Sequence, residues 1–246
     1  PPMKNIDNPN VSRETQRAQI DLIAGLDRRK LDSDHHNPEI EGAIQSFELA
    51  YRMQDEIPDI LDLKSEPESI RKLYGIGNGG EGDRFAKQCL LARRLAESGV
   101  RFVEVTAPTS WDHHSLLNDN LAKSSAITDQ PIAALLTDLK KRGMLNDTLV
   151  VWSGEFGRTP YAQGLGDGRD HNNKGYSMWM AGGGVKGGYN HGATDDFGYK
   201  AIEKPVHIHD LHATILHLLG LDHEKLTYNY AGRDFRLTDV YGNVVR

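Results

Sequence analysis

The sequence has 246 residues, of which 38% are hydrophobic and 26% charged, as is typical of a globular protein. Its formal net charge of −6 argues against a general nucleic-acid binder, and no apolar run approaches the ~20 residues of a membrane-spanning helix. The single cysteine, Cys89, excludes both an internal disulfide and a zinc cluster made of thiolates. An enzyme or a binding domain remains.

The first part of the chain is predicted to be mainly helical. Apolar residues at helical spacing predict helices from Ser12 to Lys30 and from Pro38 to Pro58, and a third helix from Arg84 to Ser98 that Gly99 closes. We expect a single domain over 1–246, with a helical region at 1–98 and a sheet-bearing region at 99–246.

The second part alternates strand and helix patterns. Val100–Thr106 and Leu149–Trp152 read as strands, and Ile127–Arg142 between them reads as a long amphipathic helix. A right-handed crossover would make the two strands parallel neighbours, so their carboxyl ends would share one sheet edge. A third strand is predicted at Tyr176–Ala181. The sequence thus favours an α/β fold with a mostly parallel central sheet.

A polar cluster follows the first of these predicted strands. Asp112, His113 and His114 lie in an extended segment, where alternate side chains share a face. Asp112 and His114 could therefore bind one cation while His113 points away, and a carboxylate with an imidazole suits zinc, manganese or iron. The alternative is a solvated polar loop at a strand end.

A carboxylate and a guanidinium follow the second predicted strand. Glu155 stands between glycines after an apolar run, where a buried carboxylate needs a cation or a hydrogen-bond donor. Either a metal or Arg158 could meet that need, so metal ligation and a structural ion pair both remain open. The fork of Arg158 also suits sulfate, phosphate or carboxylate.

A further histidine comes one short loop later. His171 follows Gly168-Arg169-Asp170, and it could supply the second imidazole of a metal site. Asp170 could orient that histidine as a hydrogen-bond acceptor behind it. An exposed loop histidine without a ligand is the alternative.

Five motifs occur together in this order: Trp111-Asp112-His113-His114, Gly154-Glu155-Phe156-Gly157-Arg158-Thr159-Pro160, Gly168-Arg169-Asp170-His171, Ala181-Gly182-Gly183-Gly184-Val185-Lys186-Gly187-Gly188 and His209-Asp210-Leu211-His212-Ala213-Thr214. Together they resemble a bacterial sulfatase-like family, long labelled a domain of unknown function, within the alkaline phosphatase superfamily. The resemblance covers essentially the whole chain. It implies a three-layer α/β/α fold of the alkaline phosphatase type with one or two divalent metals.

The resemblance also assigns residues to the site. Asp112 and His114 match the middle aspartate–histidine ligand pair, and His171 matches the last histidine ligand. Glu155 falls where the superfamily has the aspartate of an Asp-His pair. Phe156 replaces the histidine of that pair and cannot bind metal, which weakens the second metal position. We place Asp170 and His113 behind the ligands.

The family pattern includes an N-terminal strand and a Gly-Gly-Pro-Ser-type loop that this chain does not show. We expect the first ligand and any nucleophile to precede Pro1, so that the domain is N-terminally incomplete and its catalytic nucleophile is unknown. Relatives that carry an export signal imply a periplasmic or cell-surface location.

The resulting hypothesis is a metal-dependent hydrolase-type domain that acts on a sulfate or phosphate ester of a small molecule or carbohydrate. Its ligands would be Asp112, His114, Glu155 and His171, with zinc, manganese, calcium or magnesium as the metal. Arg158 would hold the substrate anion. The alternative is a catalytically degenerate module of the same fold that binds anions or carbohydrates.

Overall fold

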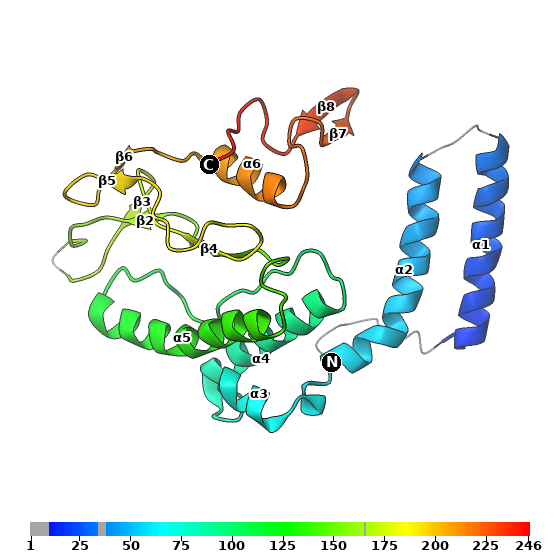
Figure 1. Cartoon of the computed structure of the whole chain (residues 1–246), viewed down its shortest axis with the longest axis horizontal. Coiled ribbons are helices and arrows are strands. Elements are labelled where there is room, and N and C mark those ends of the chain that lie inside the picture. Colours follow the sequence, from blue (N-terminus) through cyan, green and yellow to red (C-terminus); the bar gives the residue numbers. More distant parts are fainter. Residues whose placement is uncertain (1–9, 34–37, 165) are drawn as a thin grey trace. The chain divides into compact units, whose positions relative to one another are not determined.

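Figure 1 shows the computed structural model of the chain, which describes residues 10–33, 38–164 and 166–246. The chain forms two compact units, residues 1–68 and 69–246. The predicted metal ligands all belong to the second unit.

The first unit is a pair of long helices followed by a short 3-10 turn. Its helices are α1 (Arg13–Ser33) and α2 (Pro38–Leu61), and the turn η1 covers Leu63–Ser65. The Arg17 guanidinium joins the two helices through an ion pair of 2.8 Å with Glu48. Both predicted helices are confirmed, although Pro58 lies inside α2 rather than at its end.

The helices of the second unit begin with α3 (Glu68–Tyr74), α4 (Gly80–Glu97) and α5 (Leu117–Lys141). α4 packs on α5 (Figure 1). The fully or nearly fully buried side chains of this unit include Tyr74, Phe85, Cys89, Leu90 and Leu139. α5 starts well before the predicted Ile127, because the chain turns into it through Leu116 in the left-handed region. None of the described helices combines the length and apolarity that a membrane crossing requires.

The strands of the described residues pair only as short antiparallel couples. These couples are β1 (Val150–Trp152) with β4 (Trp179–Ala181), β2 (Gly157–Arg158) with β3 (His171–Asn172), β5 (Ala193–Thr194) with β6 (Ala201–Glu203), and β7 (Thr227–Tyr230) with β8 (Arg233–Arg236). Helix α6 (Ile208–Leu218) lies between the last two couples in the sequence.

The expected three-layer α/β/α fold of the alkaline phosphatase type, with its mostly parallel central sheet, is therefore wrong. Residues 100–106 form no strand, so the predicted crossover lacks its first strand. β1 pairs instead with β4 in antiparallel register, Val151 opposite Met180. Parallel strands need cover on both faces, whereas Val151 and Trp152 of β1 are both more than a third exposed.

Candidate metal centre

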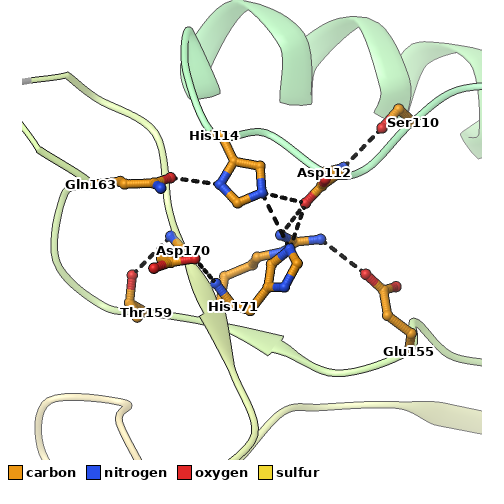
Figure 2. Close-up of polar contacts among 9 residues, drawn as sticks. Ser110, Asp112, His114, Glu155, Thr159, Gln163, Asp170 and His171 are labelled. Carbon is orange, nitrogen blue, oxygen red and sulfur yellow. Dashed lines mark hydrogen bonds and ion pairs between the residues drawn. The ribbon is translucent and has the colours of Figure 1, made fainter.

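The site forms where the loop that precedes α5 meets the hairpin of β2 and β3 (Figure 2). The backbone N–H of Arg169 donates to the carbonyl of His113 at 3.0 Å, which ties the two segments together. Ser110 supports the first loop, because its Oγ accepts the N–H of Asp112 at 3.1 Å. The predicted ligands therefore meet through two loops rather than at a parallel sheet edge.

Gly168 allows the two loops to approach this closely. A Cβ atom at this position would lie 1.9 Å from the carbonyl oxygen of His114, far inside any allowed contact. The obstacle is backbone and cannot rotate away. Glycine is needed at position 168 because, without a Cβ atom, it lets the two chain segments approach closely.

The β2–β3 hairpin places Arg158 directly opposite His171. Cross-strand partners in an antiparallel ladder have neighbouring side chains on one face. Thr159 closes the loop between the strands: its N–H donates to the carbonyl of Asp170 at 2.8 Å, and its Oγ1 accepts the Asp170 N–H at 3.1 Å. Thr159 is buried, so this closure is shielded from water.

Three side chains converge on one point, as Figure 2 shows. The Nε2 atoms of His114 and His171 each lie 2.9 Å from Oδ1 of Asp112, and they are 3.2 Å from each other. About half of the side-chain surface of Asp112 and His171 is exposed, and somewhat less of His114. The three donor atoms thus form a compact triangle that is open to solvent.

Gln163 fixes which nitrogen of His114 carries the proton. Its Oε1 lies 2.6 Å from His114 Nδ1, and a carbonyl oxygen can only accept, so Nδ1 is the donor. In the neutral imidazole, Nε2 then presents a lone pair. That lone pair points at a carboxylate oxygen and a second imidazole, an arrangement that calls for a proton or a cation between them.

The donor triangle fits a divalent metal ion. Nitrogen and oxygen ligands of zinc lie 2.0–2.2 Å from the metal, so neighbouring ligands stand about 2.8–3.6 Å apart at octahedral to tetrahedral angles. The observed separations of 2.9, 2.9 and 3.2 Å fall in that range. Asp112, His114 and His171 could therefore hold one cation.

Arg158 completes the charge arrangement. Its Nη1 contacts Asp112 Oδ1, and its Nη2 lies 3.0 Å from Glu155 Oε1. The hydrogen bond from His171 and then the Arg158 guanidinium lower the pKa of the Asp112 carboxyl to about 2. The sequence left Glu155 open between metal ligation and an ion pair. In the structure it forms the ion pair with Arg158 and stands outside the triangle.

Asp170 and His113, which the sequence places behind the ligands, contact the backbone of His171 and a side chain of α5, respectively. Asp170 Oδ1 accepts the backbone N–H of His171 at 2.8 Å, which leaves the imidazole to other neighbours. His113 is buried, and its Nε2 lies 3.5 Å from Ser124 Oγ on α5. The Phe156 ring packs against the His171 ring in a tilted arrangement, with 4.3 Å between the ring centres. Each of the three holds a loop or ring in place.

Gln163 is the functional residue that the sequence did not reveal. It reaches His114 because its own N–H donates to the carbonyl of Gly168 at 2.9 Å, which folds the loop back over the site. A glutamine in a glycine-rich loop has no distinctive spacing from the ligand it serves. The one available signal is its place between Arg158 and His171, inside the hairpin loop.

A family model described as Protein of unknown function (DUF1501) matches residues 1–246. Comparisons with curated proteins and with solved structures gave no match. The family match confirms the resemblance to a family of unknown function. The further link to sulfatases and to the alkaline phosphatase superfamily stays a prediction.

Proposed function

The chain belongs to the family Protein of unknown function (DUF1501), and we propose that it is a metal-dependent hydrolase domain that acts on a sulfate or phosphate ester. The observation that carries this proposal is the convergence of Asp112, His114 and His171 on one point, beside the guanidinium of Arg158. Three protein ligands at an exposed site leave further coordination positions for a substrate, as in catalytic metal sites.

Three of the residues would bind the metal, and two others would hold the histidine ligands in place. Asp112, His114 and His171 would hold the cation, and two imidazoles with one carboxylate favour zinc, manganese or iron over calcium and magnesium. A bound cation supplies Lewis acidity toward a phosphoryl or sulfuryl oxygen. Gln163 keeps the lone pair of His114 Nε2 directed at the shared point, and Phe156 keeps the His171 ring in place.

Arg158 gives the site its preference for anions. Its planar fork matches two oxygens of a sulfate or phosphate group, and its side chain is about a quarter exposed. The motif resemblance described above supports the same ester class. Because the triad lies at an open surface, bulky esters such as those on carbohydrates are candidate substrates.

A non-catalytic module that binds anions or carbohydrates is the second candidate. Two observations favour it. Phe156 stands where a second metal would need a histidine, and it packs on His171 instead. Across residues 10–33, 38–164 and 166–246, no hydroxyl or thiol group hydrogen-bonds to a triad side chain.

Turnover and metal content separate the two candidates. The purified chain is loaded with Zn²⁺ or Mn²⁺ and incubated with 4-nitrophenyl sulfate and 4-nitrophenyl phosphate, alongside Asp112→Ala. The proposal expects nitrophenol release that depends on the metal and disappears in Asp112→Ala while the fold persists. Metal binding without turnover of either ester would favour the binding module. Absence of metal binding in the wild-type chain would overturn the proposed hydrolase.

A further inference from the structure

One carboxylate oxygen of the site is shared by two kinds of partner. Asp112 Oδ1 faces the Nε2 atoms of His114 and His171 (Figure 2). It also contacts Nη1 of Arg158. The guanidinium therefore contacts the same carboxylate oxygen that belongs to the donor triangle. A metal ion and Arg158 both need the same negative charge.

Arg158 is held from two directions. Its Nη1 contacts Asp112, while Nη2 lies 3.0 Å from Glu155 Oε1, and the Cζ atom stands 5.5 Å from the centre of the Phe156 ring. Its backbone belongs to β2, opposite His171. Loss of the contact with Asp112 would therefore leave the guanidinium beside the site, tethered by Glu155, with one arm of its fork free.

We propose, on the basis of the function proposed above, that Arg158 competes with the divalent cation for Asp112, so that metal binding frees one arm of Arg158 for the oxyanion of the substrate. Two positive groups that share one carboxylate oxygen repel each other, and each weakens the other's hold. The free arm offers charge-assisted N–H donors to a sulfate or phosphate oxygen.

This exchange couples the two ligands. In the metal-free protein, Asp112 and Glu155 together neutralise Arg158, which leaves little attraction for an anion. Once a bound metal neutralises the Asp112 carboxylate, the positive charge of the Arg158 guanidinium is less compensated and attracts an oxyanion more strongly. Linkage is reciprocal, so sulfate must then tighten metal binding by the same factor by which metal tightens sulfate binding.

The test is a calorimetric titration of the chain with Mn²⁺ and, separately, Zn²⁺ in chloride buffer, with and without inorganic sulfate. The key variant is Arg158→Gln. Without sulfate it is expected to bind the metal more tightly than wild type, by roughly three- to thirty-fold, the size expected for removal of one partly exposed positive charge beside a doubly charged ion. Sulfate should tighten metal binding more in wild type than in the variant.

Two further variants guard the result. Arg169→Gln removes a nearby arginine whose Nη1 bonds to backbone carbonyls of Asp167 and Gly168, and it should change metal affinity by less than about twofold because solvent screens its charge. Arg158→Met keeps an apolar stem beside Phe156 and should tighten metal binding as Arg158→Gln does.

The outcomes are distinguishable. Tighter metal binding in both Arg158 variants, with Arg169→Gln near wild type, supports the exchange. A direct attraction between metal and sulfate would also couple the ligands, but it would leave sulfate-free metal affinity unchanged in Arg158→Gln. Unchanged or weaker metal binding in that variant overturns the inference and spares the proposed function. A wild-type chain that binds neither metal overturns both.

Discussion

The second unit contains two clusters built from arginine and aspartate, and they differ in burial and in the partners of the aspartate carboxylate. In the core, Asp138 accepts from Tyr74 Oη at 3.1 Å and pairs with Arg93 at 3.0 Å and Arg142 at 2.9 Å. The side chains of Arg93 and Asp138 are 1% and 3% exposed. Every one of these partners offers a donor to the carboxylate, so the Asp138 carboxylate is neutralised without a ligand.

The cluster around Asp112 has the opposite character. Its carboxylate is about half exposed, and two imidazole nitrogens face the same oxygen. The contact between Gln163 and Nδ1 of His114 leaves Nε2 of His114 unprotonated, with its lone pair available. The comparison teaches that ion pairs alone do not identify a functional site. What sets the Asp112 cluster apart is that the Nε2 lone pair of His114 faces a carboxylate oxygen at an open surface, where a cation could bind between them.

The largest expected effect separates the clusters by stability. Asp138→Ala leaves the buried charge of Arg93 without this carboxylate, and such losses cost about 3–5 kcal/mol. Urea unfolding should show this cost, with no change in the metal affinity of the folded fraction. Asp112→Ala should leave the unfolding transition close to that of wild type, because its site is exposed. Equal losses of stability in both variants would remove the distinction between the clusters.

A second prediction concerns the approach of the two loops. Gly168→Ala inserts a methyl group into the backbone of His114, and we expect a loss of about 1–3 kcal/mol in stability together with weaker metal binding. Gly166→Ala is the matched control in the same loop, since its Cβ would meet nothing closer than 3.7 Å. Comparable behaviour of the two variants in thermal unfolding would contradict the close approach.

A third prediction sharpens the argument about acceptors. Gln163→Leu removes the acceptor that holds the proton on His114 Nδ1, and loss of such a partner typically lowers metal affinity by about 10–100-fold. Gln163→Glu keeps an acceptor and should retain the tautomer. Nitrogen-15 NMR of the metal-free protein reads the tautomer directly. An unchanged His114 spectrum in Gln163→Leu would show that the glutamine does not set it.

The smallest effect is a shift in titration. The pKa of Asp112 is lowered to about 2, first by the His171 hydrogen bond and then by Arg158. A folded-state pKa below the usual ~3.9 means that the contribution to stability is fully present above about pH 4 and is lost as the pH falls toward 2. Carbon-13 NMR of the metal-free protein should therefore show a higher pKa in His171→Ala, and a smaller rise in Arg158→Gln. No rise in either variant would contradict these contacts.

Three of the ligands that sequence reasoning named lie together in the structure, but Glu155 does not join them, and the expected framework of a parallel sheet was wrong. Asp112 and His114 stand two apart in an extended segment, a spacing that places both side chains on one face without reference to any sheet. His171 meets them because Gly168 lets the loops touch. These local features can be recognised in the sequence, and the three side chains do converge in the structure.

The sheet could not be predicted in the same way. The apolar run at Val150–Trp152 indicates a strand, and β1 is there, but the pattern does not say which strand pairs with it. Alternation at 100–106 suggests a strand where the structure has none, because no partner pairs with that segment. Gln163 stayed hidden for a related reason: its role depends on a loop closure that only the folded backbone reveals.

The most direct test of the account is X-ray absorption spectroscopy of the chain loaded with one equivalent of Zn²⁺. The account predicts one bound ion with two imidazole nitrogens and an oxygen ligand at about 2.0–2.2 Å. It also predicts that Asp112→Ala loses more than about 100-fold in zinc affinity, which is roughly the largest loss expected for removal of a residue that only supports a ligand. A spectrum without imidazole scattering, or equal zinc binding by Asp112→Ala and wild type, would contradict the claim that Asp112, His114 and His171 form a metal site.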